Sequence, residues 1–257
     1  AADVILCENL DDERYLYRFG EYITENELGT ARYLKSLPWE TLKKMADVYT
    51  EGYREGFINT GKDLSKKSAV DIRYRLGFER VVKLAIENFE KMGLSPVIYR
   101  AASGVITKKG HRKVGFYGAI ANKQYEYDHR QDEALFLDKR YMERKLDVLR
   151  HVYEGNERQA GQYAGPALIQ TFGESPFSPE VKKEAIAYTE AQRRLSLQYD
   201  GKAGQITNQY IKGEERSFTI IAFPVPEIGE QFPEIFEEVI RINTLDYQLY
   251  RGIQQTI

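Results

Sequence analysis

The sequence contains very few residues that bind soft metal ions or form disulfide bonds. It has one cysteine, Cys7, and three histidines, His111, His129 and His151, among 257 residues. A single cysteine cannot form a disulfide within the chain, and such low cysteine usage is typical of a reducing compartment. We therefore expect a cytoplasmic protein.

The motifs of several enzyme classes are also missing. No H-E-x-x-H or C-x-x-C pattern is present, and there is no G-x-S-x-G elbow. Neither glycine pattern of the common phosphate-binding loops occurs. Zinc peptidases of the first pattern, serine hydrolases and dinucleotide-binding enzymes are therefore disfavoured, and we expect no metal ligands or catalytic residues in this chain.

Long apolar runs and a strong net charge are missing as well. No uninterrupted apolar stretch approaches the roughly 18 to 20 residues that span a bilayer. The 37 Lys and Arg residues nearly balance the 39 Asp and Glu residues, for a formal net charge of −2. A basic stretch, 108–113, precedes Phe116 and Tyr117, but one short stretch in a near-neutral chain favours a solvated loop. We expect neither nucleic acid nor membrane as a partner.

The hydrophobic pattern divides the chain into two units. Apolar residues recur at three- and four-residue steps through 1–61, which predicts a helical segment. A polar connection, 62–67, comes next, and 68–257 alternates between strand and helix patterns. We expect the two units to pack as one.

The second unit predicts an α/β fold with a doubly wound, mainly parallel sheet behind the N-terminal helical segment. The expected elements are a strand near 70–74, a helix over 81–89, a strand at 97–99, a loop with one short strand over 103–130, a helix over 132–153, a strand at 167–169, a helix over 179–199, a strand at 218–223 and a helix from 233 onward.

One polar cluster stands out in the second unit. Asp128, His129 and Arg130 are followed by Asp132 and Glu133. These groups could surround an ion, but acidic residues at a helix start also cap it and interact with its dipole. The capping interpretation needs no convergence of distant groups and is favoured. A deep pocket lined by the cluster would instead indicate a small-molecule enzyme that acts at the carboxyl ends of the strands.

Three segments carry a resemblance to a known family. Residues 68–74 and 92–100 resemble the opening strand–helix–strand unit of thermophilic-type metal-dependent aminopeptidases, the aminopeptidase T, S and II group. Residues 214–229 resemble the strand and double-proline turn that precede the catalytic half of that family. Residues 11–257 are most similar to longer clostridial proteins labelled leucyl aminopeptidases, including 125–130, 135–139 and 202–213.

The resemblance implies a division of labour between two halves. In the family, a second half holds two divalent metal ions (Zn, Co or Mn are expected) through carboxylates, histidines and a tyrosine, and the metal-bound water hydrolyses N-terminal peptide bonds. The resemblance ends before those ligands, so none can be placed on this sequence. It implies that the chain is a scaffold that packs on the metal half, forms part of the wall of the cavity for the peptide substrate and contributes to a homo-oligomer.

The same resemblance suggests where the two halves meet. The double-proline turn, with Phe223, Pro224 and Pro226, and Arg216 upstream of it, is the predicted surface facing the metal half. Prolines also end strands without any ligand contact, and that interpretation stays open. The chain starts with Ala1 rather than methionine, and its helical pattern continues to Ile257, so we expect that processing or truncation set one or both ends.

A second hypothesis is that this subgroup has lost peptidase chemistry and that the domain is a binding or assembly module. The sequence beyond Ile257 would separate the two, because only the first hypothesis needs Glu, His, Asp and Tyr ligands there.

Overall fold

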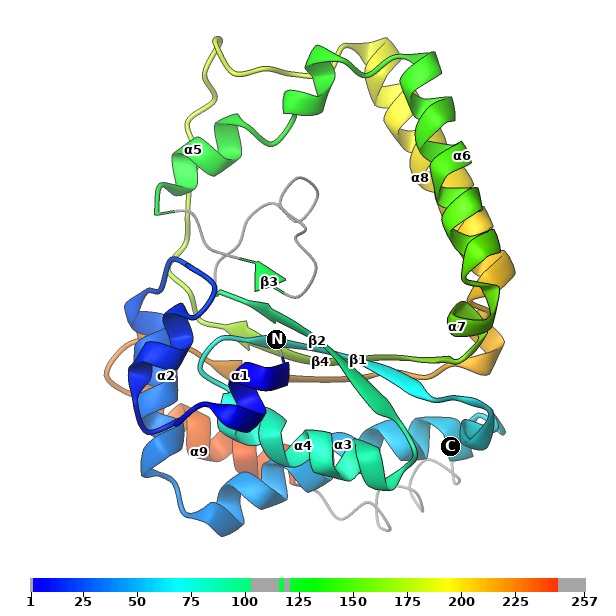
Figure 1. The fold of residues 1–257 in the computed structure, drawn as a ribbon. Helices are drawn as coiled ribbons and strands as arrows, with labels where there is room; N and C mark the ends of the chain where they lie inside the picture. The colour runs from blue at the N-terminus through cyan, green and yellow to red at the C-terminus, as the bar shows by residue number, and fades with distance from the viewer. Residues whose placement is uncertain (1, 103–115, 118–120, 245–257) are drawn as a thin grey trace, which may run out of the picture.

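A computed structural model of the chain describes residues 2–102, 116–117 and 121–244 (Figure 1). Its centre is a five-stranded sheet in the order β3-β2-β1-β4-β5, with every pair of neighbours parallel. The strands are β1 (Ala69–Arg75), β2 (Ser95–Ala101), β3 (Phe116–Tyr117), β4 (Tyr163–Phe172) and β5 (Thr219–Pro224). The chain moves outward from β1 to β3 and then crosses to β4 and β5, which confirms the predicted doubly wound α/β class.

Helices of both predicted units cover one face of the sheet. The main helices of this layer are α3 (Trp39–Asn59), α4 (Glu79–Lys91) and α9 (Phe232–Asn243), with α1 (Ala2–Cys7) and α2 (Glu25–Ser36) beside them (Figure 1). Short 3-10 turns are η1 (Glu13–Tyr17), η2 (Leu64–Lys66), η4 (Gly213–Glu215) and η5 (Pro226–Ile228). The N-terminal helical segment is therefore part of the layer that covers the sheet.

The core of this layer reflects the helical spacing of apolar residues. On α3, Tyr49, Tyr53 and Phe57 lie one turn apart and are fully buried, and they pack with alternate residues of the strands, such as Ile72. The Tyr53 hydroxyl donates a hydrogen bond to the Gly165 carbonyl oxygen at 3.0 Å, so its polar end is satisfied inside the core. The N-terminal helical segment and the sheet thus share one hydrophobic core.

The remaining helices form a unit that we name the arm, residues 121–161 and 173–210. It contains α5 (Lys123–Asp128), η3 (Asp132–Leu135), α6 (Lys139–Gly155), α7 (Glu157–Gly161) and α8 (Glu190–Tyr210). Both connections run from the carboxyl end of one strand to the amino end of the next, so α6 and α8 lie side by side in the same direction (Figure 1). Hydrogen bonds between the two connections join residues 54 to 58 positions apart along their length.

The arm has a small core of its own. Met142, Leu146 and Ile206 are buried between α6 and α8, and the Tyr153 and Tyr210 rings stack with centroids 5.1 Å apart. Figure 1 shows both helices standing away from the sheet and meeting the rest of the molecule mainly near their carboxyl ends. A crossover helix normally packs on its sheet, so this separation leaves apolar surface on the second face of the sheet.

Three expectations about the elements are wrong. The region 103–130 is predicted to be a loop with a short strand, but 123–128 forms α5, whose first turn is capped when Asn122 Oδ1 accepts from the Tyr125 amide. The helix expected over 132–153 is divided into η3 and α6, because Asp138 caps a new start. The helix expected over 179–199 begins only at Glu190, where Thr189 and Gln192 form a capping box, and it continues to Tyr210. The short helix α7 is not predicted by the sequence pattern.

At Gly165 the backbone of β4 closely approaches the segment that leads into β5. Its φ is +115°, and a Cβ there would lie 1.9 Å from the Ser217 carbonyl oxygen. Gly165→Ala should destabilise the fold by more than about 2 kcal/mol, since both the conformation and the space exclude a side chain. Gly155→Ala is the matched control: the helix end is open there, and a change within about 1 kcal/mol is expected. Urea unfolding measures both, and equal effects would contradict this account of the strand pair.

Candidate functional site

In open α/β sheets, ligands bind at the carboxyl ends of the strands where the winding direction changes, which in this chain lies between β1 and β4. Here the backbone amide of Gly77, just after β1, donates to Glu79 Oε2 at 2.8 Å. A side chain at Gly77 would lie 2.9 Å from the Glu27 carbonyl oxygen on α2. The loop that cradles a phosphate in nucleotide-binding proteins of this fold is therefore covered by α2, and its amide already has a partner.

The double-proline turn closes the next part of this edge. Asn26 Nδ2 donates to Glu227 Oε2 at 2.9 Å, and the Glu227 amide donates back to Asn26 Oδ1 at 3.0 Å. The bond from Asn26 holds the pKa of Glu227 below its usual value. A hollow of about 270 Å³ lies here, lined by Thr24, Glu25, Asn26, Pro226 and Glu227. The hollow offers carboxylates and one hydroxyl, that of Thr24, which donates to Glu27 Oε2 at 2.6 Å as part of the capping box of α2.

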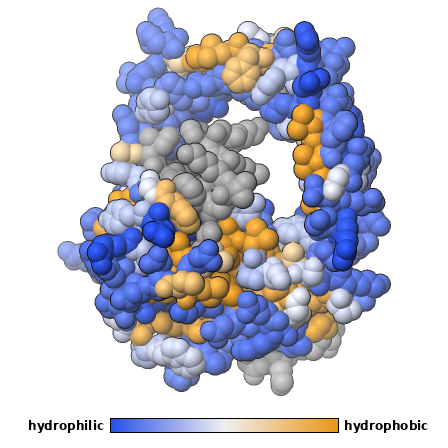
Figure 2. All heavy atoms as spheres, viewed as in Figure 1, coloured by the Kyte–Doolittle hydropathy of each residue, from blue (hydrophilic) through white to orange (hydrophobic). Residues whose placement is uncertain are grey.

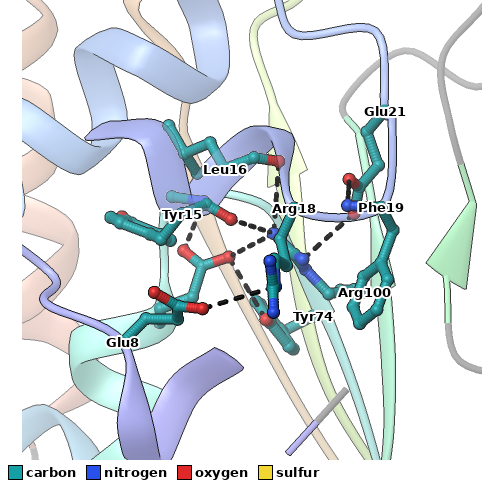
Figure 3. A network of polar contacts seen from close by, with 10 residues as sticks. Glu8, Tyr15, Leu16, Arg18, Phe19, Glu21, Tyr74 and Arg100 are labelled. Carbon is teal, nitrogen blue, oxygen red and sulfur yellow. Dashed lines mark hydrogen bonds and ion pairs between the residues drawn. The ribbon is translucent and has the colours of Figure 1, made fainter. Parts of the chain in front are cut away.

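A buried charge cluster lies beside this edge, where the N-terminal segment crosses the end of β2 (Figure 3). Arg100 is fully buried, with its Nη1 at 3.1 Å from Glu21 Oε1 and its Nη2 at 3.4 Å from Glu79 Oε1. Arg100 Nη2 also donates to the Tyr15 and Leu16 carbonyl oxygens at 3.5 and 3.4 Å. One guanidinium therefore joins residues of η1, the segment after it, β2 and α4.

The cluster contains two carboxylates, Glu21 and Glu79, and one cation, Arg100. Burial raises the pKa of Glu79, although Arg100 opposes the shift. The Tyr74 hydroxyl donates to Glu79 Oε1 at 3.2 Å, and burial raises the pKa of this tyrosine too. Because Arg100, Glu21 and Glu79 have no exposed side-chain surface, a substrate cannot reach them. We assign the cluster a structural role: it fixes the N-terminal segment to the sheet.

The predicted polar cluster does not converge. Asp128 accepts from Gln124 at 2.6 Å and from Lys182 Nζ at 2.9 Å, and the Lys182 bond is the main cause of its lowered pKa. His129 Nδ1 lies 2.8 Å from Asp132 Oδ2, while the Arg130 guanidinium stacks over the Tyr127 ring at 3.6 Å.

The three side chains thus make local contacts that stabilise α5 and join it to the neighbouring segment of the arm. The structure shows neither a shared ligand site nor a side-chain cap from this cluster, because Asp128 is the last residue of α5 and η3 has no side-chain cap; Asp132 and Glu133 lie in the first turn of η3, where acidic residues interact favourably with the helix dipole. The basic stretch 108–113 lies outside the described residues.

The residues predicted to face a partner half are spread along β5. Phe223 is 1% exposed and packs on the rings of Phe78 and Phe236, with centroids 5.4 and 4.9 Å away. Pro224 is buried, whereas Pro226 is partly exposed and lies against Gly29 of α2. Arg216 lies before the amino end of the strand, where its carbonyl oxygen accepts from Lys62 Nζ at 2.7 Å. Only Pro226 and its neighbours are therefore available to an outside surface at the turn.

The surface that sequence reasoning missed is the second face of the sheet, which we name the open face. Its strand positions are Asp71, Arg73, Arg75, Val97, Tyr99, Ala101, Pro166, Leu168, Gln170, Phe172, Ile220 and Ala222. Tyr99, Arg73, Leu168 and Ile220 stand side by side in register across four strands. Val97 and Ile220 are 47% and 51% exposed, although both are strand residues of a parallel sheet.

The centre of the open face carries an ordered polar group. Arg73 Nε donates to Asp71 Oδ2 at 2.6 Å, and its guanidinium carbon lies 5.6 Å from the centroid of the Tyr99 ring. Figure 2 shows an opening between the arm and the rest of the molecule, with apolar side chains on the surfaces that border it. The run of alternating residues in β1 indicated this face, but only the position of the arm reveals that helices leave it uncovered.

No metal site forms in the described part of the chain. Within residues 2–102, 116–117 and 121–244, no three His, Cys, Asp or Glu side chains lie close enough together to hold an ion. The donor set of these residues therefore does not fit the divalent ions that the family resemblance implies. Across the same residues, no helix combines the length and apolar composition needed to cross a bilayer.

Comparison with protein-family models, with curated proteins and with solved structures gives no match.

The buried cluster makes a direct stability prediction. Arg100→Met should destabilise the chain by about 3 to 5 kcal/mol, because it leaves the carboxylates of Glu21 and Glu79 buried without a cation. Arg241→Met removes an ion pair with Glu238 on the exposed side of α9 and should leave the unfolding midpoint almost unchanged. Thermal unfolding of both variants is the measurement. A small effect of Arg100→Met would show that the cluster does not hold the N-terminal segment.

Proposed function

We propose that this chain is the non-catalytic half of a cytoplasmic metal-dependent aminopeptidase, and that it supports the metal-binding half by packing against it through the open face. The observation that carries the proposal is the exposure of Val97 and Ile220, at 47% and 51%, and the partial exposure of Leu168 on one face of the sheet. Parallel sheets are normally covered on both faces, and contiguous exposed apolar surface marks an interaction site.

The family assignment within this proposal rests on where the resembling segments lie. Residues 68–74 include most of β1, 92–100 include most of β2, and 214–229 contain β5 with its double-proline turn. All three segments belong to the sheet, so the resemblance concerns the scaffold and not a catalytic centre. The paired Zn, Co or Mn ions, the peptide substrate and the homo-oligomer then belong to the assembled protein.

The arm is the observation that favours the second candidate function. The arm is a large addition to the sheet and has its own hydrophobic core. A domain that only supports a neighbouring domain would not need such an addition. A binding or assembly module without peptidase chemistry would use the same open face and the same arm. The two candidates differ in the sequence they need beyond Ile257, since the first requires Glu, His, Asp and Tyr metal ligands there.

Activity measurements test the peptidase proposal. The isolated chain should release no leucine from a leucyl substrate with Zn²⁺, Co²⁺ or Mn²⁺ added. The protein expressed from its whole gene should release it with metal and lose activity on chelation. Metal-dependent turnover by the isolated chain would contradict a supporting role, and an inactive whole protein would favour the assembly module.

The docking surface has its own matched variants. Val97→Asp with Ile220→Asp places two carboxylates on the open face, and should abolish association with the polypeptide encoded beyond Ile257 when the two are co-expressed. The control pair, Ile58→Asp with Ile242→Asp, changes two isoleucines of similar exposure on α3 and α9 and should bind as the unmodified chain does. Affinity co-purification measures both. Undiminished binding by the open-face variant would place the interface elsewhere.

A further inference from the structure

The outer edge of β5 carries backbone groups that no other strand of the described chain pairs. β5 is the last strand in the sheet order, so β4 occupies only one of its two edges. The Ser217 amide donates to the Ala164 carbonyl oxygen at 3.0 Å. Further along, the Val225 amide donates to the Phe172 carbonyl oxygen at 2.9 Å. Both segments advance by the same number of residues between these bonds, so the odd-numbered residues of β5 face β4. The even-numbered residues point their amides and carbonyl oxygens away from the sheet: Phe218, Ile220 and Ala222.

This edge is exposed and unprotected. In the part of the chain that the structure describes, the three outward amides have no backbone partner. Phe218 and Ile220 are 64% and 51% exposed, and Thr219 and Ile221 on the covered side are only partly buried. Natural proteins usually protect an edge strand with charged residues, proline or a bulge. Residues 217–223 contain no charge and no proline, and the register with β4 is continuous. An edge of this kind fits an added β-strand.

The side chains along the edge are complementary to those of a second copy. When two copies pair antiparallel about Ile220, the two Ile220 side chains lie opposite each other, and Phe218 of one copy lies opposite Ala222 of the other. A large side chain then meets a small one on both sides of the axis. Residues 217–225 are uncharged, so the copies meet without like-charge repulsion. Pro224 is the next outward position and has no amide donor, which ends the pairing beyond Ala222.

We propose that β5 is a dimerisation strand, which pairs antiparallel with β5 of a second copy and joins the two sheets into one. A strand of another protein could satisfy the same amides, but the size pattern about Ile220 matches a copy of β5 itself. The two-fold axis stands perpendicular to the sheet, so both open faces lie on the same side of the joined sheet. The inference goes beyond the proposed function, because it uses the backbone edge of β5 and leaves the open face to the metal half.

Proline at position 222 tests the pairing. Ala222→Pro removes an outward amide and leaves the bonds to β4 in place, which an edge strand tolerates. It should weaken dimerisation by about tenfold or more, because the carbonyl oxygen opposite position 222 loses its donor in both copies. Ala222→Ser keeps the amide and a small side chain, and should dimerise as the unmodified chain does. Sedimentation over a range of chain concentrations measures all three proteins, and circular dichroism shows whether each one folds.

A second variant decides the question where proline at position 222 prevents folding. Phe218→Lys places a cation at the edge of each copy, and should convert the dimer to a monomer. Leu197→Lys is its control, because it places the same cation on α8 at a position that is 71% exposed, and it should leave the dimer unchanged.

The remaining outcomes overturn the inference. A chain that stays monomeric at every concentration has no dimerisation strand, and a dimer that survives both Ala222→Pro and Phe218→Lys uses another surface. Loss of binding to the polypeptide encoded beyond Ile257 by folded Ala222→Pro would show that a strand of that polypeptide, and not a second copy, occupies the edge. A monomeric chain leaves the proposed function standing, provided that Val97→Asp with Ile220→Asp still abolishes association with that polypeptide.

Discussion

Apolar side chains stand on both faces of this parallel sheet, and the described helices bury only one of them. On the covered face, α3, α4 and α9 bury residues such as Tyr53, Phe89 and Phe236 in one continuous core. On the open face, Leu168 and Ile220 lie beside each other with no helix of the described chain packed over them (Figure 1). The layer that would normally cover them, α6 and α8, is packed on itself. Within the described residues, one face of the sheet is therefore covered by helices and the other carries exposed apolar side chains, which is unusual for a parallel sheet.

The buried charges explain why the covered side keeps its shape. Arg100 joins the N-terminal segment to β2 and α4, and Glu79 both caps the loop after β1 and accepts from Tyr74. This closes the loop after β1, where similar folds bind nucleotides, because its amide is already bonded and α2 lies against it. Because the side chains of Arg100 and Glu79 have no exposed surface, they fix the positions of the elements they join and do not contact a substrate. The same fold can in this way serve as a scaffold, and its function depends on what its surfaces contact.

Much of the sheet could be predicted from the sequence, because Val70, Ile72 and Tyr74 alternate with polar residues and 218–223 is an apolar run before two prolines. The arm could not be predicted in the same way. Periodicity predicts a helix over 179–199, but the start at Glu190 is fixed by the Thr189 capping box and by the bond that Gln192 donates to the Ala134 carbonyl oxygen of η3. The site was harder still. Asp128, His129 and Arg130 are adjacent in sequence yet point to different partners, whereas the open face is made of residues far apart in sequence that the register brings together.

The most direct test of the account is the accessibility of the open face in the whole protein. With the exposed Cys7 replaced by serine, a single cysteine at position 220 or 97 can be labelled with a maleimide. The account predicts fast labelling in the isolated chain and strong protection in the protein expressed from its whole gene, while a cysteine at position 242 on α9 labels equally in both. Equal labelling of position 220 in the two proteins would contradict the claim that another body covers this face.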